Sequence, residues 1–375
     1  MTDLLPIDAD RATLVGRVFD PESDGPCVVA VRGDKVVDLT PVEPTMSGLL
    51  DRADLLDVVT GAGGREWPLE DLLSGALRPL APCDLQVIKA AGVTFVRSMI
   101  ERVIEERAQG DPKLAADIRR RIESVIGGMI GGLVPGSPES ARVKEVLVAE
   151  GLWSQYLEVG IGPDAEVFTK APVLSAVGAG AEIGIPEHSL WNNPEPELVL
   201  AVTSDGRAVG ATLGNDVNLR DVEGRSALLL SKAKDNNASC AIGPFIRLFD
   251  DSFGVDDVRG LDIELTVTGT DGFVLEGTSS LSEISRDVLD LVGQTIGDHH
   301  QYPDGFVLFT GTLFAPTQDR DVPGEGFTHK VGDRVRISSP RLGSLTNVVA
   351  HAEKAAPWNF GVRALIANLA ARGLL

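Results

Sequence analysis

The segment WNNPEPELVLAV, residues 191–202, places two glutamates at the entrance to an apolar run. Residues 198–202 have the composition of a buried strand, and successive side chains of a strand point to opposite faces of its sheet. Because Glu195 and Glu197 are two positions apart, we expect their carboxylates to project in parallel from one face. Two anions side by side repel each other, so the pattern indicates a compensating cation.

A third carboxylate comes from the segment ATLGNDVNLRD, residues 211–221. Asp216 follows an apolar strand and a glycine, where a loop side chain can turn back toward the strand of Glu195 and Glu197. A set of three hard oxygen ligands suits Mg²⁺, Mn²⁺ or Ca²⁺ and leaves coordination positions for water and substrate. The alternative is that the glutamates face solvent on an edge strand and that Asp216 belongs to a turn.

The segment SKAKDNNASCAIGPF, residues 231–245, adds positive charge. Lys234, placed near an anionic metal site, would neutralise an enolate or a carboxylate of a substrate. The alternative for this polar stretch is a solvated loop. Cys240 has no base close to it in the sequence, and we interpret it as a small packed residue.

The composition excludes several classes of partner. The formal charge of -21 at pH 7 argues against nucleic acid and anionic membranes, because both would repel the chain. Three widely spaced cysteines fit a reducing cytoplasm better than a disulfide framework. The sequence has no run of about 18 uncharged apolar residues and does not begin with the pattern of a signal peptide. We therefore expect a cytoplasmic protein that acts on a small molecule.

The order of the segments predicts a small N-terminal domain, residues 1–84, and a larger body, residues 85–375. Residues 12–40 alternate apolar and polar positions around a glycine-containing turn, which is typical of a hairpin. Residues 48–59 have helical spacing, and the Pro-containing stretch 79–84 indicates a linker.

The body begins with helical segments and continues as β-rich sequence. Residues 97–109, 112–127 and 138–150 are rich in Arg, Glu and Ala and predict three helices, which together would form a flap. From residue 156 onward, short β-rich runs are separated by Gly, Asn, Asp and Pro, which favours a mostly antiparallel β body. The predicted fold class is therefore α+β.

Four motifs, in this order and spacing, resemble the fumarylacetoacetate hydrolase superfamily. They are a PEPEL strand, an N-D-x-x-x-R-D loop, a segment from lysine to Gly-Pro, and a T-G-T turn, at residues 194–198, 215–221, 234–244 and 310–312. The resemblance implies a β-sandwich roll and a homodimer or a dimer of dimers.

The resemblance also assigns roles to individual residues. It implies that Glu195, Glu197 and Asp216 are metal ligands, that Lys234 contacts an oxygen of the substrate, and that Thr312 holds the carboxylate end of the substrate. Lys170 belongs to a segment, FTK at residues 168–170, that resembles an F-x-K element whose lysine lies near the pocket. On the sequence alone, a solvated lysine is an equal interpretation of Lys170.

One departure from the family pattern bears on the reaction. Hydrolytic members begin the body with G-x-N-Y-x-x-H-x-x-E, in which the histidine activates water; here Ser98 occupies the histidine position and Glu101 is kept. Serine does not titrate near neutral pH as imidazole does, so hydrolysis by this pair is not expected. Glu101 is the candidate base instead, with metal-bound water or a second carboxylate as alternatives.

A divalent metal, a lysine and a glutamate are sufficient to dehydrate a 2-keto-3-deoxy sugar acid. Chelation of the carboxylate and keto oxygens acidifies the C3 proton, and the resulting enolate expels the hydroxyl of the next carbon. Nearly the whole chain, residues 1–84 included, resembles the 2-keto-3-deoxy-D-xylonate and D-arabinonate dehydratase branch of the superfamily. That resemblance implies Mg²⁺ as the metal and 2,5-dioxopentanoate, which is 2-oxoglutarate semialdehyde, as the product.

Two other functions stay open. Hydrolysis of a C–C bond in a 2,4-diketo acid would require another base, such as His299 or His300. A non-catalytic metal-binding or ligand-binding protein would keep the metal site without the reaction. The remaining histidines, His188, His329 and His351, show no ligand spacing in the sequence.

Overall fold

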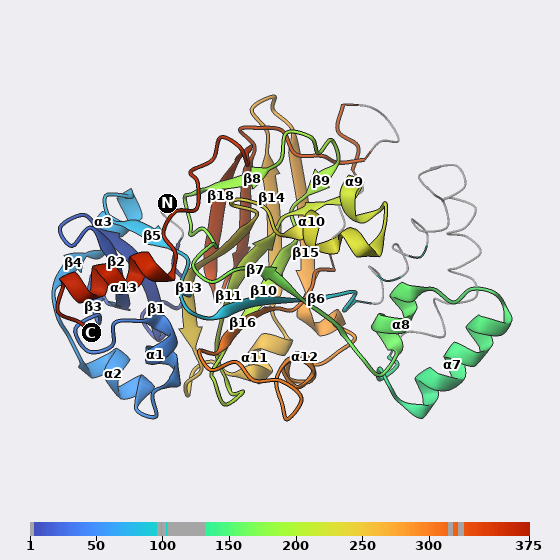
Figure 1. Cartoon of the computed structure of the whole chain (residues 1–375), viewed down its shortest axis with the longest axis horizontal. Helices are drawn as coiled ribbons and strands as arrows, with labels where there is room; N and C mark the ends of the chain where they lie inside the picture. Colours follow the sequence, from blue (N-terminus) through green and yellow to red (C-terminus); the bar gives the residue numbers. More distant parts are fainter. Residues whose placement is uncertain (1–3, 96–98, 100–102, 104–131, 314–317, 322–325) are drawn as a thin grey trace.

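The computed structural model describes residues 4–95, 99, 103, 132–313, 318–321 and 326–375 of the chain (Figure 1). Ser98 and Glu101 lie outside the described residues. The predicted helix 112–127 also lies outside them, and so does most of the predicted helix 97–109.

The larger of the two main sheets contains the strand that follows the PEPEL motif. Its strands run side by side in the order β4 (Glu66–Pro68), β3 (Lys35–Asp38), β2 (Gly25–Arg32), β1 (Leu14–Asp20), β13 (Cys240–Leu248), β11 (Ala208–Asp216), β10 (Pro196–Val202), β16 (Phe306–Phe309), β6 (Val87–Gly92) and β7 (Glu166–Ala171). β5 (Arg78–Leu80) also pairs with β1. Its strand pairs are antiparallel except for the parallel pair of β16 and β6.

A second sheet packs against one face of the first. Its order is β15 (Val274–Ser280), β14 (Asp262–Thr268), β17 (Arg334–Ser339), β18 (Gly343–His351) and β8 (Glu182–Ile185), with β18 and β8 parallel. The apolar core between the sheets includes Leu198 and Leu200 from β10 and Ile263 and Ile337 from the second sheet. The predicted mostly antiparallel α+β architecture agrees with these pairings.

The register of β10 and β11 continues beyond the sheet. Pro196 lies opposite Asn215, and the short strands β9 (Asn192–Asn193) and β12 (Asn218–Leu219) pair with Asn193 opposite Asn218. The same register sets Glu195 opposite Asp216, whose amide donates to the Glu195 carbonyl at 3.1 Å. These four strands, β9, β10, β11 and β12, form a two-stranded ribbon. Side chains therefore alternate between its core face and its opposite face along its whole length.

The helices are short and lie around the sheets. They are α1 (Met46–Asp51), α2 (Leu55–Gly61), α3 (Leu69–Ser74), α7 (Pro138–Ala149), α8 (Gln155–Ile161), α9 (Arg220–Glu223), α10 (Leu230–Lys234), α11 (Val255–Arg259), α12 (Val288–Thr295) and α13 (Val362–Ala371), with single 3₁₀ turns at Ala227–Leu229 and Leu281–Glu283. Helix α7 confirms the prediction for residues 138–150: the hydroxyl of Ser137 accepts from the Ser140 amide, and Pro138 occupies the first turn. Within the described ranges, no helix is both long and apolar enough to cross a bilayer.

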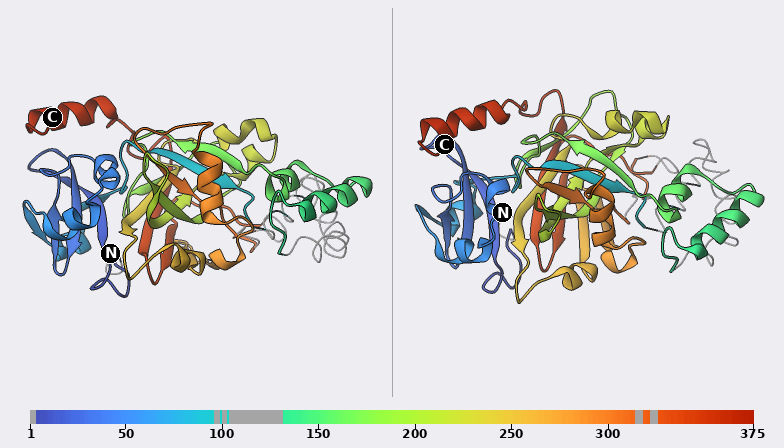
Figure 2. Two further views of the ribbon diagram at one scale, coloured as in Figure 1. Left: turned by 90° about the horizontal axis from the view of Figure 1, so that it is seen from below. Right: turned by 60° about the horizontal axis from the view of Figure 1, so that its bottom comes forward.

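The N-terminal segment shares its sheet with the body. The predicted hairpin is confirmed as β2 and β3, joined through Gly33 with φ 58°. β1 continues the sheet by pairing with β13, with Val15 opposite Ile246. Helix α13 lies beside these N-terminal strands at the end of the molecule opposite α7 (Figures 1 and 2). The larger sheet contains strands from both sides of residue 84. The division of the chain into two domains at that residue stays a prediction.

The junction between β1 and β13 gives a testable expectation. Val15 is fully buried in a cluster with Ile246 and Leu248. Val15→Ala removes two methyl groups from this cluster and should lower the free energy of unfolding by about 2 kcal/mol. In urea monitored by circular dichroism, we expect a single transition at a lower midpoint. Two separate transitions, of which only one moves, would contradict a shared core.

Candidate metal centre

Three carboxylates converge at the ends of β10 and β11. Glu195 directly precedes β10, Glu197 lies within it, and Asp216 is the last residue of β11. One oxygen from each lies within 4.8 Å of the others, and the three residues are 6, 2 and 1% exposed. β10 is an interior strand between β11 and β16, so the alternative of a solvent-facing edge strand is wrong. The loop position predicted for Asp216 is also wrong, because this residue ends a strand, directly opposite Glu195.

Two buried lysines neutralise part of this charge. Lys234, at the end of α10, places Nζ against Glu195 Oε2 and 2.9 Å from Asp216 Oδ2. Lys170, on β7, places Nζ 2.8 Å from Asp216 Oδ1 and is fully buried. Burial lowers the pKa of Lys234, but the carboxylates of Asp216 and Glu195 outweigh it and raise that pKa above its ordinary value. The solvated alternatives for Lys170 and Lys234 are therefore wrong.

Lys170 also ties three segments of the chain together. Its Nζ donates to the carbonyls of Val217, at 3.2 Å, and of Lys234, and to Ser239 Oγ at 3.4 Å. Phe168, two residues earlier on β7, lies with its ring centroid 5.8 Å from Lys234 Nζ. The F-x-K segment thus braces residues 234–244, called the lysine loop below, against the end of β11.

Together, Glu197 and the charged groups around it have a net negative charge. Burial raises its pKa, and the nearby Asp216 and Glu195 raise it further, although Lys234 and the Gly311 amide oppose them. Three carboxylates therefore outnumber the two lysines in a buried space. A set of hard oxygen donors with surplus negative charge fits a divalent cation such as Mg²⁺, with Glu195, Glu197 and Asp216 as the residues that would hold it.

The T-G-T turn anchors Glu197. The Gly311 amide donates to Glu197 Oε2 at 2.7 Å, and the Thr310 amide donates to the Leu198 carbonyl at 3.0 Å. Thr94, which follows β6, donates its hydroxyl to the Thr310 carbonyl at 2.7 Å. Thr312, half-buried, is the next residue after Gly311. Thr94 precedes the candidate residues Ser98 and Glu101 in the sequence by four and seven positions.

The histidines considered for a hydrolytic base lie elsewhere. His299 and His300 are exposed, in the connection that leads to the start of β16, and Phe306 in β16 pairs with Val202. Val202 is five residues beyond Glu197, which corresponds to about 17 Å along a strand. The geometry therefore gives no support to a hydrolytic base at either residue.

His329 is a buried histidine that its spacing in the sequence did not single out. Its Nδ1 lies 3.0 Å from Asn192 Oδ1, and burial lowers its pKa to about 4. Asn192 belongs to the core face of the ribbon by strand alternation, opposite to the face that carries Glu195. His329 is therefore a neutral packing residue on the far side of the sheet.

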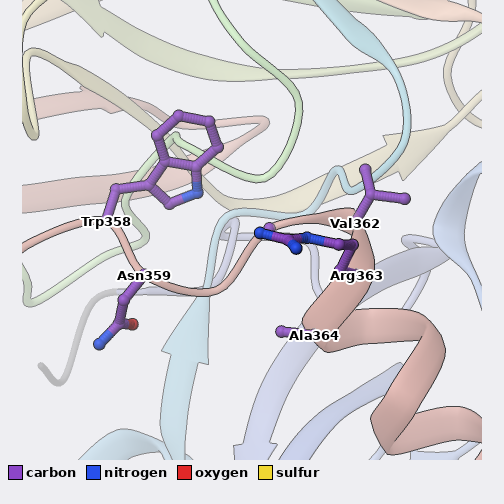
Figure 3. A pocket seen from close by; sticks show the side chains of 6 residues that line it. Trp358, Asn359, Val362, Arg363 and Ala364 are labelled. Atoms are coloured by element: carbon purple, nitrogen blue, oxygen red, sulfur yellow. The ribbon is translucent and has the colours of Figure 1, made fainter.

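Two further features of the surface do not belong to this site. Glu187, His351 and Glu353 also bring possible ligand atoms within 4.8 Å, but the glutamates are exposed and Glu187 pairs with Lys354 at 2.9 Å. Sequence spacing missed this grouping because Glu187 is far from the others along the chain. A pocket at the start of α13, lined mainly by Trp358, Asn359 and 361–364, contains none of the cluster residues (Figure 3).

Comparison with known proteins identifies the family. The family model described as "Fumarylacetoacetate (FAA) hydrolase C-terminal" matches residues 152–350. The chain belongs to the fumarylacetoacetate hydrolase family. The resemblance in its four motifs is thereby confirmed.

Two curated proteins are similar to the chain. A "Probable 2-keto-3-deoxyxylonate dehydratase" of Haloferax volcanii is 33% identical over 211 residues, which is 56% of this chain and 68% of that protein. A "2-dehydro-3-deoxy-D-arabinonate dehydratase" of Saccharolobus solfataricus is 31% identical over 189 residues, which is 50% of this chain and 60% of that protein.

Solved structures share the fold over most of the chain. The apo form of 2-keto-3-deoxy-D-arabinonate dehydratase superposes with a TM-score of 0.64 at 22% identity and covers 90% of this chain and 99% of that one. The same enzyme "complexed with magnesium and 2,5-dioxopentanoate" gives a TM-score of 0.62, also at 22% identity, with 90% and 99% of the two chains covered. At this identity the likeness describes the fold.

Gly311 is the position at which the turn constrains the cluster most directly. Its φ is 89°, and a Cβ there would lie 2.1 Å from Thr94 Oγ1. Gly311→Ala should displace the amide that holds Glu197 and weaken Mg²⁺ binding by at least about tenfold, measured as Mg²⁺-induced stabilisation in thermal unfolding.

The matched control is Gly272→Ala, at φ 86°, where an added Cβ would meet no other atom of the described chain within 4 Å. It carries the same backbone strain and should lose stability while keeping its response to Mg²⁺. An unchanged response in Gly311→Ala would show that the turn does not organise the site.

Proposed function

We propose that this chain catalyses the metal-dependent dehydration of a 2-keto-3-deoxy-D-pentonate, derived from D-xylonate or D-arabinonate, to 2,5-dioxopentanoate. The observation that carries the proposal is the buried meeting of Glu195, Glu197 and Asp216 with Lys170 and Lys234. This charge pattern suits a small, doubly oxygenated anion such as a 2-oxo acid. The names of the two curated relatives, and the magnesium complex of a protein with the same fold, support the choice of reaction.

The reaction removes one proton and one hydroxyl and yields water. Bound Mg²⁺ would act as a Lewis acid on the 2-oxo acid and so acidify its C3 proton. Glu101 is the proposed base for that proton, and Ser98 is three positions before it in the sequence motif. Departure of the C4 hydroxyl, then transfer of a proton from C5 and tautomerisation, gives the aldehyde at C5.

The other residues hold and orient the substrate in this proposal. Lys234, already between Glu195 and Asp216, is placed to stabilise negative charge that develops on the substrate's oxygen. Lys170 keeps Asp216 and the lysine loop in position and is the second cation at the site. Thr312, which follows the Gly311 anchor, is proposed to hold the substrate carboxylate.

Hydrolysis of a 2,4-diketo acid is the weaker candidate. It requires a base that activates water, and Ser98 replaces the histidine that does so in hydrolytic relatives. His299 and His300, the possible substitutes, lie beyond the opposite end of β10. Dehydration needs no activated water.

Product detection tests the proposal directly. Purified protein with Mg²⁺ and 2-keto-3-deoxy-D-xylonate, and separately with the D-arabinonate-derived acid, should give 2,5-dioxopentanoate by mass spectrometry. EDTA should stop the reaction, and Glu197→Gln should lower it strongly because it removes one proposed ligand charge. Cleavage of a 2,4-diketo acid by the same preparation, with the sugar acids unchanged, would overturn the proposal.

Lys234→Met separates metal binding from catalysis. Because Lys234 is a cation among the proposed ligands, its removal should strengthen Mg²⁺ binding, measured by isothermal titration calorimetry. The same change should lower kcat by about 10²-fold or more, because a charge that stabilises the transition state is lost.

Lys232→Met, exposed on the same helix, is the matched control and should alter neither quantity. Weaker Mg²⁺ binding in Lys234→Met, or an unchanged kcat, would contradict the role assigned to this lysine.

A further inference from the structure

The face that carries the carboxylates continues along the ribbon of β9 and β12. Two cross-strand pairs follow one another on it, Glu195 with Asp216 and Asn193 with Asn218. Beyond them Trp191 contacts Arg220, the first residue of α9. Contacts on both sides of the asparagine pair indicate that these side chains share one face of the ribbon. Lys234 bridges Glu195 and Asp216, and the Arg220 guanidinium stacks on the Trp191 ring at 4.3 Å.

These residues lead from the surface of the molecule to the carboxylate cluster. Trp191 and Arg220 are half-buried, Asn193 and Asn218 are 3 and 0% exposed, and the carboxylate pair beyond them is also buried. The asparagines therefore lie between an accessible rim and the candidate metal centre. Any substrate that reaches the centre along this face passes them.

Each asparagine has one polar atom without a partner. Asn193 Nδ2 donates to the Pro194 carbonyl at 3.0 Å, and Asn218 Nδ2 donates to Glu223 Oε2 at 2.5 Å. Because both nitrogens meet oxygens, the remaining atom of each amide is the acceptor Oδ1. Neither Oδ1 has a hydrogen-bond partner within the described part of the chain. A buried acceptor without a donor costs free energy, so two of them side by side indicate a ligand that brings donors.

We propose that Asn193 and Asn218 bind hydroxyl groups at the distal end of the substrate. This rests on the proposed function, which places the 2-oxo acid end at the carboxylate cluster. Hydroxyls fit because they are neutral donors that can satisfy both Oδ1 acceptors, whereas a carboxylate or phosphate oxygen brings no proton to them. The pair would then make the site selective for hydroxylated 2-oxo acids over their deoxygenated analogues.

The dimensions agree with such a ligand. Side chains two residues apart on a strand are separated by about 6.6 Å, which is the spacing from the Glu195–Asp216 pair to the asparagine pair. In a 2-keto-3-deoxypentonate, four bonds of about 1.5 Å connect C2 to the C5 oxygen and extend over about 5 Å. The C4 and C5 hydroxyls provide two donors for two acceptors, and both hydroxyls are absent from 2,5-dioxopentanoate.

The test compares two acids that cannot be dehydrated. 5-Hydroxy-2-oxopentanoate and 2-oxopentanoate differ by one hydroxyl, and neither has a C4 hydroxyl to lose. Binding of each to the Mg²⁺-loaded protein is measured by isothermal titration calorimetry. We expect the hydroxylated acid to bind about five- to tenfold more tightly to the natural chain, and Asn193→Ala and Asn218→Ala each to reduce this ratio toward one.

The control is Asn192→Ala, because Asn192 neighbours Asn193 but lies on the core face with His329. Its ratio should equal that of the natural chain. Mg²⁺-induced thermal stabilisation checks that each variant is folded, and Asn→Ser replaces an alanine variant that fails this check. Equal binding of the two acids by the natural chain would overturn the proposal. It would also be overturned if Asn193→Ala and Asn218→Ala both kept the affinity ratio of the natural chain. Because no turnover is involved, failure of dehydration and failure of this pair are separate results.

Discussion

The buried ion cluster at the end of β10 and β11 is the constraint on which the rest of the site depends. Three carboxylates removed from water are costly unless cations and hydrogen-bond donors approach them. Lys170 comes from β7, Lys234 from α10 and the Gly311 amide from the turn after β16. Segments far apart in the chain must therefore meet at one point for the fold to tolerate this charge, and the surplus negative charge that remains suits a divalent cation.

The continuous register of the ribbon determines which groups face that cation. A shift of one residue between β10 and β11 would carry Asp216 or the glutamates to the core face, among Leu198, Leu200 and the second sheet. The burial of apolar side chains on the core face therefore determines which polar side chains point to the opposite face. The bracing by Lys170 and the T-G-T turn acts on an arrangement that the hydrophobic pattern has already selected.

Local pattern in the sequence is sufficient for some of these features. The two-residue periodicity of a strand predicts that Glu195 and Glu197 share a face, and the cap at Ser137 predicts helix α7. Both depend on neighbours in the chain, so a single sequence contains the information.

Contacts between distant segments are not accessible in the same way. Local pattern puts Asp216 on a loop because the extent of β11 depends on its pairing with β10 and β13. The continuation of the sheet from β13 into β1 joins residues more than 200 positions apart, and the burial of Lys170 requires the approach of the lysine loop. The family motifs supply the grouping of these residues, which periodicity alone leaves open.

The arrangement along the polar face also bears on how a dehydration would end. The proposed cluster recognises the 2-oxo acid, a feature that substrate and product share, so it cannot by itself favour departure of the product. In the proposed arrangement, Asn193 and Asn218 would contact the groups that the reaction consumes, since the C4 hydroxyl leaves and the C5 hydroxyl becomes an aldehyde. An aldehyde oxygen is only an acceptor, and facing two amide oxygens it gains no hydrogen bond from either. A pair of acceptors at this position would therefore bind the substrate and release the product, using the same two side chains.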